Sequence, residues 1–213
     1  MPNETDSPRL TARFADALTY AADLHKTQVR KGGDIPYIGH LLSVAALVIE
    51  AGGTETQAIA ALLHDAVEDQ GGADTLAEIE SRFGQGVAGI VDDCSDTDED
   101  PKPPWRSRKE SYIEHLADVS TETILVSAAD KLDNARAILR DLRNEGPSLW
   151  ERFTEKDPGE HLWYYRALAE RYESAGDNWV FDELKRTIVL IEREIVGNAA
   201  RKQDSPATAV RPL

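Results

Sequence analysis

The sequence is poor in cysteine and has no long apolar run. Its single cysteine, Cys94, cannot form an internal disulfide, so the chain suits a reducing compartment. The apolar runs without a charged residue, such as residues 123–129, are shorter than the roughly 20 residues that span a bilayer. The N-terminal stretch MPNETDSPRL lacks both the basic and the apolar regions of a secretory signal. We therefore expect a cytoplasmic protein without a membrane segment.

Positive charge is also scarce. The chain carries 24 Lys and Arg against 39 Asp and Glu, a formal net charge of −15. Such a field repels a polyanion, so we expect no nucleic acid polymer as a partner. A phosphorylated substrate would need local basic clusters and bound cations to overcome this field. The composition leaves the oligomeric state undetermined.

The apolar pattern predicts an all-α fold. Helical spacing recurs along the chain, and no segment alternates apolar and polar residues as a strand does. We predict a bundle of about eight to ten helices that forms one domain over residues 1–197. Residues 198–213 lack apolar periodicity and are expected to form a disordered tail. The expected helices are 14–24, 40–50, 57–70, 74–83, 84–94, 106–117, 121–143, 162–174 and 179–196.

The stretch ALLHDAVED sets His64, Asp65, Glu68 and Asp69 directly beside an apolar run. On one continuous helix over residues 57–70, these four side chains share an arc next to the apolar face. A solvated surface is the ordinary explanation for three acids. However, no lysine or arginine stands in this window, and unpaired carboxylates this close repel one another. A bound divalent cation would remove that repulsion.

Further ligands must come from other segments. His40 stands at a loop-to-helix junction after Gly39, and Asp130 follows the apolar run ILVSAA, where an unpaired carboxylate is costly. With His64 and Asp65 they form a mixed nitrogen and oxygen set suited to Mn²⁺, Fe²⁺, Zn²⁺ or Ni²⁺. The sequence does not choose among these metals.

These residues and their surroundings resemble the HD-domain metal-dependent phosphohydrolases. The segments that carry the resemblance are, in chain order, RKGGDIPYIGH (30–40), AALLHDAVED (60–69), FGQGVAGIV (83–91) and ADKLDNARAIL (129–139). The chain looks most like the hydrolase domain of the RelA/SpoT homologues, which removes the 3′-pyrophosphate from guanosine alarmones. Too little chain remains for the synthetase half, so the resemblance is to the stand-alone small alarmone hydrolases.

The resemblance implies an HD-type helical bundle with a metal site, two catalytic acids and a nucleotide site. The implied Mn²⁺ ligands are His40, His64, Asp65 and Asp130; the acids for water activation and proton transfer are Glu68 and Asp69; the nucleotide contacts are Arg30, Lys31 and Asn134. Three positions depart from the family pattern. Leu41 follows the first histidine instead of proline, Gln70 replaces a threonine, and Asp133 stands where relatives often carry histidine.

A second basic cluster follows the acidic loop at residues 96–105. Arg106, Arg108 and Lys109 stand at a predicted helix N-terminus, where basic residues are disfavoured, so the cluster suggests a bound anion. A solvated helix start is the ordinary alternative. Together with Arg30 and Lys31, the cluster predicts a small nucleotide substrate with phosphates at both ends.

The leading hypothesis is hydrolysis of the 3′-pyrophosphate of a purine alarmone such as (p)ppGpp, giving GDP or GTP and pyrophosphate. A 5′-nucleotidase of the same fold would have little use for two basic clusters. A di-iron oxygenase would need further histidines near the HD pair, and the chain has five histidines in all. A non-catalytic antitoxin would not need Glu68 and Asp69. A (p)ppApp-specific hydrolase with an antitoxin role also stays open. We expect His25, His115 and His161 to be structural and Cys94 to be buried and inert.

Overall fold

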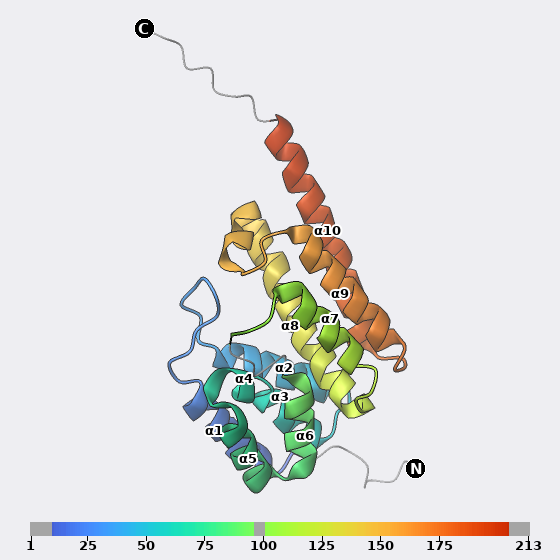
Figure 1. The fold of residues 1–213 in the computed structure, drawn as a ribbon. Coiled ribbons are helices and arrows are strands. Elements are labelled where there is room, and N and C mark those ends of the chain that lie inside the picture. The colour runs from blue at the N-terminus through green and yellow to red at the C-terminus, as the bar shows by residue number, and fades with distance from the viewer. Residues whose placement is uncertain (1–9, 96–100, 205–213) are drawn as a thin grey trace.

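The computed structural model describes residues 10–95 and 101–204, with side chains to residue 198, as an assembly of helices (Figure 1). The described residues form ten α-helices and one 3-10 helix, and their only β-type pairing is the isolated bridge between Val29 and Pro36. The all-α prediction is confirmed. No helix in the described ranges combines the length and apolarity that crossing a membrane requires. The elements are α1 Ala12–Leu24, α2 Ile38–Glu50, α3 Glu55–Leu63, α4 Ala66–Gln70, α5 Gly72–Phe83, α6 Gln85–Cys94, α7 Trp105–His115, α8 Thr121–Glu145, the 3-10 helix η1 Gly146–Arg152, α9 Pro158–Glu173 and α10 Trp179–Asp204.

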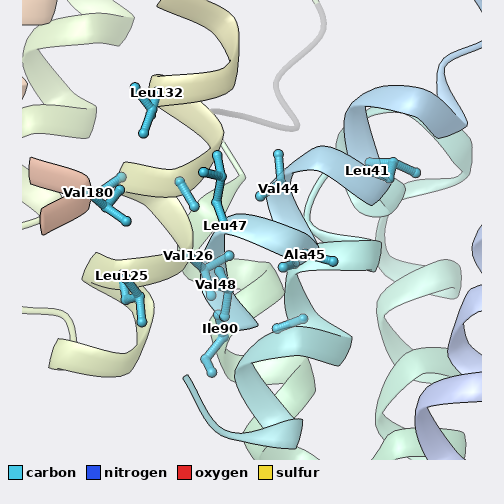
Figure 2. Close-up of a cluster of buried hydrophobic side chains, with 14 of the residues drawn as sticks. Leu41, Val44, Ala45, Leu47, Val48, Ile90, Leu125, Val126, Leu132 and Val180 are labelled. Atoms are coloured by element: carbon cyan, nitrogen blue, oxygen red, sulfur yellow. The ribbon is translucent and has the colours of Figure 1, made fainter. Parts of the chain in front are cut away.

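Helix α8 is the centre of the assembly. It packs against α2, α3, α6 and α10, and the apolar run that opens it is buried on all sides. Figure 2 shows the resulting cluster, in which α2 side chains meet those of α8, α6 and α10. Ala128 and Ala129 are fully buried, and their small side chains let neighbouring helices approach closely. Because Asp130 follows them directly, packing of α8 fixes the place of that carboxylate.

Helix α3 begins at Glu55, two residues before the predicted start at residue 57, and Thr54 is its N-cap. The Thr54 side chain accepts a bond from the Gln57 main-chain N–H, and the Gln57 side chain in turn accepts from the Thr54 N–H. This reciprocal capping satisfies two N–H groups that a helix start leaves without partners. It fixes the start of the helix that leads to His64.

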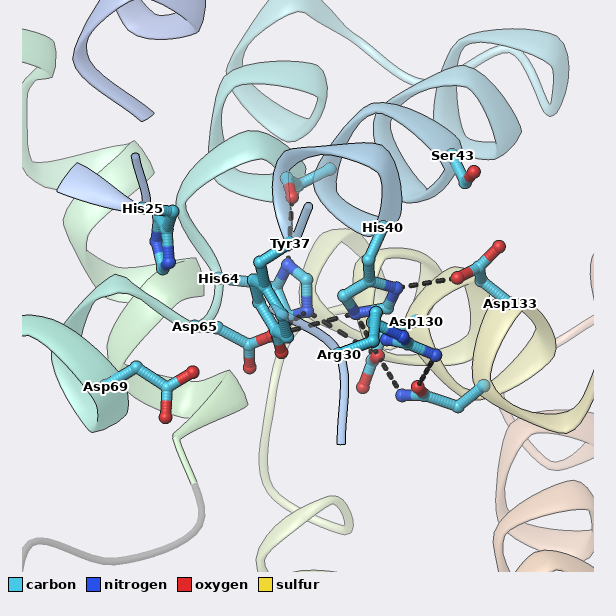
Figure 3. Close-up of polar contacts among 12 residues, drawn as sticks. His25, Arg30, Tyr37, His40, Ser43, His64, Asp65, Asp69, Asp130 and Asp133 are labelled. Carbon is cyan, nitrogen blue, oxygen red and sulfur yellow. Dashed lines mark hydrogen bonds and ion pairs between the residues drawn. The ribbon is translucent and has the colours of Figure 1, made fainter. Parts of the chain in front are cut away.

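The single helix predicted over residues 57–70 is wrong, because the chain breaks at His64 and Asp65. Helix α3 ends at Leu63, α4 begins at Ala66, and Asp65 has φ −98° and ψ 0°. These angles lie in the sparsely populated bridge region, which is frequent at active sites. The His64 ring donates to the Ala61 carbonyl at 2.9 Å and so competes with the helical ladder. The break turns the Asp65 side chain toward His40 and Asp130 (Figure 3).

The predicted disordered tail also begins too early. Helix α10 extends to Asp204 and projects beyond the other helices, so disorder is wrong for residues 198–204 (Figure 1). The sequence AARK at 199–202 consists of strong helix formers, which continue a helix without an apolar face. Residues 205–213 lie outside the described residues, as do residues 96–100 of the predicted acidic loop.

Candidate metal centre and active site

Four side chains from α2, the α3–α4 junction and α8 meet at one buried point (Figure 3). The His40 Nε2 lies 3.6 Å from Asp65 Oδ2 and 3.1 Å from Asp130 Oδ1. The His64 Nε2 lies 3.0 Å from the same Asp65 oxygen and 3.5 Å from the same Asp130 oxygen. With metal–ligand bonds of about 2.1 Å, neighbouring ligand atoms stand about 3.0–3.4 Å apart. The structure therefore brings the four predicted ligands together at spacings that suit one ion.

The Nδ1 atom of each histidine ring already has a hydrogen-bond acceptor. The His40 Nδ1 lies 2.6 Å from Asp133 Oδ2, and the His64 Nδ1 lies 2.9 Å from the Ala61 carbonyl oxygen. Each Nδ1 therefore carries a proton, and in the neutral ring that a metal requires each Nε2 would present a lone pair to the cluster. Both Nε2 atoms are buried without a hydrogen-bond partner of good geometry among the described residues. Imidazole nitrogens and carboxylates in this arrangement fit a divalent transition metal.

Mutual attraction dominates the electrostatics of the cluster. Burial opposes a charge on His40, but hydrogen bonds to Asp130, Asp133 and Asp65 outweigh it and raise the pKa of His40 to about 9. Burial is likewise outweighed at His64, where Asp65 and Asp130 raise the pKa. Burial opposes charge on Asp65 too, but the two histidines lower its pKa. A cation that enters this ion-paired cluster must displace protons.

Both oxygens of Asp130 have further partners. Its Oδ2 accepts from Lys131 Nζ at 2.5 Å, and its Oδ1 accepts from Asn134 Nδ2 at 2.5 Å. The Arg30 guanidinium donates to Asn134 Oδ1 at 2.9 Å. Two of the residues predicted to contact the nucleotide are thus connected to a candidate metal ligand. After the opposing effect of burial, Lys131 is the main reason that the pKa of Asp130 is lowered.

The predicted catalytic acids lie beside the cluster and have different partners. The Glu68 carboxylate accepts from Lys102 Nζ at 2.6 Å, and Asp69 Oδ2 accepts from Gln28 Nε2 at 2.7 Å. Burial raises the pKa of Asp69, and the nearby charges of Asp65 and Glu68 add to this, while the Gln28 hydrogen bond opposes it. Glu68 is therefore held by a charged group and Asp69 by a neutral amide.

One cleft of about 470 Å³ opens beside the cluster, and of the four candidate ligands Asp65 is the one among the described residues that lines it. The predicted residues on its wall are Arg30, Lys31, Asp65, Glu68, Asp69, Lys109 and Asn134. Aromatic and further basic side chains complete the wall, including Tyr37, Trp105, Lys131, Arg140, Arg152, Tyr164 and Tyr165. The cleft thus contains carboxylates together with cations that suit phosphate groups.

Two residues of the predicted basic cluster do not line this cleft in the described part of the chain. Arg106 forms ion pairs with Glu110 at 2.8 Å and Glu160 at 2.7 Å, and its guanidinium lies over Trp163. The Arg108 Nε donates to the Pro103 carbonyl at 3.2 Å. Lys109 does line the cleft because it lies one helical turn after Trp105, on the same face of α7. The prediction for Arg106 and Arg108 is corrected accordingly.

Sequence reasoning missed four residues that contact the site: Gln28, Tyr37, Lys102 and Lys131. The Tyr37 hydroxyl donates to Asp65 Oδ2 at 2.6 Å, and its position three residues before His40 is a usable signal. Lys131 directly follows Asp130 in the sequence, so its ion pair with Asp130 was also predictable. For Gln28 and Lys102 the sequence offers no comparable signal, because their partners lie 41 and 34 residues away.

The all-helical fold and the buried cluster of two histidines and two aspartates define a metal-site protein of the HD type. Residues 17–158 match the model of the HD domain, and the chain belongs to this family. Curated relatives include the guanosine-3′,5′-bis(diphosphate) 3′-pyrophosphohydrolase MESH1 of Xenopus tropicalis, 42% identical over 142 residues that cover 65% of this chain and 74% of that protein. The human MESH1 is 39% identical over 142 residues, with the same coverage.

More distant similarities point in the same direction. The bifunctional (p)ppGpp synthase/hydrolase SpoT of Escherichia coli is 33% identical over 132 residues, which cover 59% of this chain and 18% of that protein. The solved structure of a metazoan SpoT orthologue that hydrolyses ppGpp has a TM-score of 0.64 and 27% identity. That similarity covers 91% of this chain and 97% of the other.

Proposed function

We propose that this protein hydrolyses the 3′-pyrophosphate of a purine alarmone such as (p)ppGpp, giving GDP or GTP and pyrophosphate, with Mn²⁺ as its cofactor. The observation that carries the proposal is one cleft whose wall combines Asp65 of the candidate metal cluster with the acids Glu68 and Asp69 and with several cations. The MESH1 and SpoT relatives, named for this activity, support it. The lone cysteine agrees with a cytoplasmic location.

The proposed chemistry divides among the residues as follows. His40, His64, Asp65 and Asp130 would hold the cation, and Asp133 and the Ala61 carbonyl fix the histidine rings. A divalent ion bound there supplies Lewis acidity and lowers the pKa of the attacking water. Glu68 and Asp69 are the acids for water activation and proton transfer. The water oxygen forms a bond to phosphorus, the bond from phosphorus to the 3′-oxygen breaks, and a proton returns to the 3′-oxygen.

Substrate binding relies on cations from separate elements. Arg30 and Lys31 come from the loop before α2, Asn134 from α8 and Lys109 from α7. Because the chain carries a net charge of −15, these local cations are needed to attract a nucleotide that bears several phosphates. Basic groups on different walls of one cleft suit a substrate with phosphates at both ends.

The test is a product analysis with the purified protein and Mn²⁺. The panel contains ppGpp, ppApp and nucleoside 5′-monophosphates, with a chelator-treated sample as control. We expect GDP and intact pyrophosphate from ppGpp, and less activity when Zn²⁺, Fe²⁺ or Ni²⁺ replaces Mn²⁺. Release of orthophosphate from 5′-monophosphates, with both alarmones untouched, would instead identify a nucleotidase.

A further inference from the structure

A polar network lies behind Asp69, and the proposed function makes no use of it. Gln28, in the segment between α1 and α2, donates through Nε2 to Asp69 Oδ2 at 2.7 Å. Its Oε1 accepts from Gln70 Nε2 at 2.6 Å and lies 2.7 Å from the Nδ1 of His25. His25 is only 2% exposed, so it is a fixed partner. The network joins the end of α1, the loop that follows and α4.

The network permits one orientation of the Gln28 amide. Because a carboxylate accepts hydrogen bonds, the Gln28 atom that lies 2.7 Å from Asp69 Oδ2 must be the amide nitrogen. The carbonyl oxygen then faces Gln70 Nε2 and His25 Nδ1, which donate to it. The reverse orientation would set N–H groups against two donors and an oxygen against the carboxylate. Gln70, which departs from the family's threonine, therefore helps to orient Gln28.

His25 also supports the metal side of the site. Its ring stacks on Tyr37 with centroids 5.5 Å apart and an interplanar angle of 22°. The Tyr37 hydroxyl donates to Asp65 Oδ2 at 2.6 Å. Figure 3 shows His25, Asp65 and Asp69 on the same side of the cluster, away from Asp133. The buried His25 ring is thus connected to two acids of the site. It reaches Asp69 through Gln28 and Asp65 through Tyr37.

We propose that Gln28 is a positioning residue that holds Asp69 Oδ2 and so leaves Oδ1 to receive the proton of the attacking water. This inference rests on the proposed function. Without a donor at Oδ2, repulsion from Glu68 and Asp65 would rotate the Asp69 side chain out of the cleft. A neutral amide can orient the carboxylate and still leave it basic, whereas a lysine or arginine would stabilise its charged form. Glu68, which pairs with Lys102, lacks this arrangement.

The proposal is tested with four proteins: wild type, Gln28→Ala, Asp69→Asn and the double variant. We expect Gln28→Ala to lower kcat about 10–100-fold, the usual effect of removing an orienting partner, with KM and metal content unchanged. In the Asp69→Asn background, Gln28→Ala should cause no further loss, because Gln28 acts through Asp69. A purely structural role would give the same fold-loss in both backgrounds.

Two more variants keep the test decisive. Gln70→Ala removes one donor to the Gln28 carbonyl and leaves Gln28 in place, so a smaller fall in kcat is expected even if Gln28→Ala folds poorly. The matched control is Gln57→Ala, another buried glutamine, which bonds Thr54 and the Glu122 carbonyl in the cap of α3. It should lower the melting temperature and leave kcat unchanged.

The outcomes separate this inference from the proposed function. The same four proteins give a second cycle from their free energies of unfolding, which needs no substrate. If wild type hydrolyses no alarmone, the proposed function fails. The coupling energy in the unfolding cycle then still shows whether Gln28 and Asp69 interact. If wild type is active but Gln28→Ala keeps normal kcat, or its effects multiply with those of Asp69→Asn, the positioning role is overturned.

Discussion

The His40 ring donates through Nδ1 to Asp133 at 2.6 Å, and this bond decides which nitrogen faces the candidate metal. The two residues lie 93 positions apart, on α2 and α8. In many metal sites a carboxylate accepts a hydrogen bond from the metal-binding histidine and so orients its ring. Asp133 is placed to do the same for His40. The position where relatives often carry histidine has a defined structural task in this chain.

Asp133→Ala should therefore weaken metal binding about 10–100-fold, because the His40 ring loses its orientation. The measurement is the metal dissociation constant by competition with a chelator. Asp182→Ala, which removes an exposed acid that lies 3.4 Å from Lys185, is the control and should bind metal normally. Unchanged affinity in Asp133→Ala would refute the orienting role.

Glu68→Gln should lower kcat by about 10²–10⁴, because it keeps the shape of the side chain and removes a proton acceptor. Metal content should stay normal, since Glu68 is bound to Lys102 and is not one of the four candidate ligand side chains. Elemental analysis and steady-state kinetics measure both properties. A variant with full metal and near wild-type kcat would show that Glu68 takes no part in proton transfer.

Metal binding should release protons at pH 7. Contacts with Asp130, Asp133 and Asp65 overcome burial and raise the pKa of His40 to about 9, so its ring is protonated in the metal-free protein at pH 7. A metal requires the neutral ring, so the apparent affinity should rise as pH rises through about 9. Calorimetry in two buffers of different ionisation enthalpy measures this release. Equal heats in both buffers at pH 7 would contradict the prediction.

The same pKa has a consequence for stability without metal. Because the folded value for His40 lies above its ordinary 6.5, the charged ring stabilises the folded state fully below pH 6.5. That contribution is lost as pH rises through about 9. The metal-loaded protein should lack this dependence, which denaturant titrations of the two forms can compare.

Lys109→Ala should raise KM about tenfold with little change in kcat, because a cation that lines the cleft is lost. Arg106→Ala is the matched control from the same helix. Its guanidinium is bound to Glu110 and Glu160, outside the cleft wall, so KM should not change. Steady-state kinetics with ppGpp decide between the two positions. The same rise in KM in both variants would contradict the prediction that Lys109 contacts the substrate and Arg106 does not.

Gly32→Ala should raise KM about three- to tenfold by displacing the loop that carries Arg30 and Lys31. Gly32 has φ +79°, and an added Cβ would lie 2.3 Å from Arg152 Cδ. Arg152 cannot withdraw freely, since its guanidinium pairs with Asp141 at 3.2 Å and also with Glu145. An alanine in this backbone region costs about 1–2 kcal/mol.

Gly33→Ala is the matched control for that loop. An added Cβ at Gly33 meets no atom within 4 Å among the described residues, and the residue has no positive φ. Its KM should equal that of wild type. Trypsin cleavage after Lys31 gives a second measurement, which should become faster in Gly32→Ala alone. The same KM in both variants would show that the Arg152 contact does not hold the loop.

Much of this protein can be predicted from short stretches of its sequence. Apolar periodicity predicts nearly every helix, because a helix buries one face and the spacing records that face. Asp130 stands out because an acid directly after a buried run needs a partner. The adjacent His64 and Asp65 stand out because no basic residue in their window balances them. These signals, with the four resembling segments, were sufficient to predict the four candidate ligands that the structure brings together.

The tertiary structure alone decided how those groups are oriented. The break between α3 and α4 depends on a ring-to-carbonyl bond, which no periodicity records. Lys109 faces the cleft and Arg106 does not, although both belong to one basic cluster, because α9 supplies Glu160 to bind Arg106. A sequence fixes the faces of each helix relative to its own axis. Which faces meet depends on packing between elements, since the contacts that orient Asp69 and His40 join residues 41 and 93 positions apart.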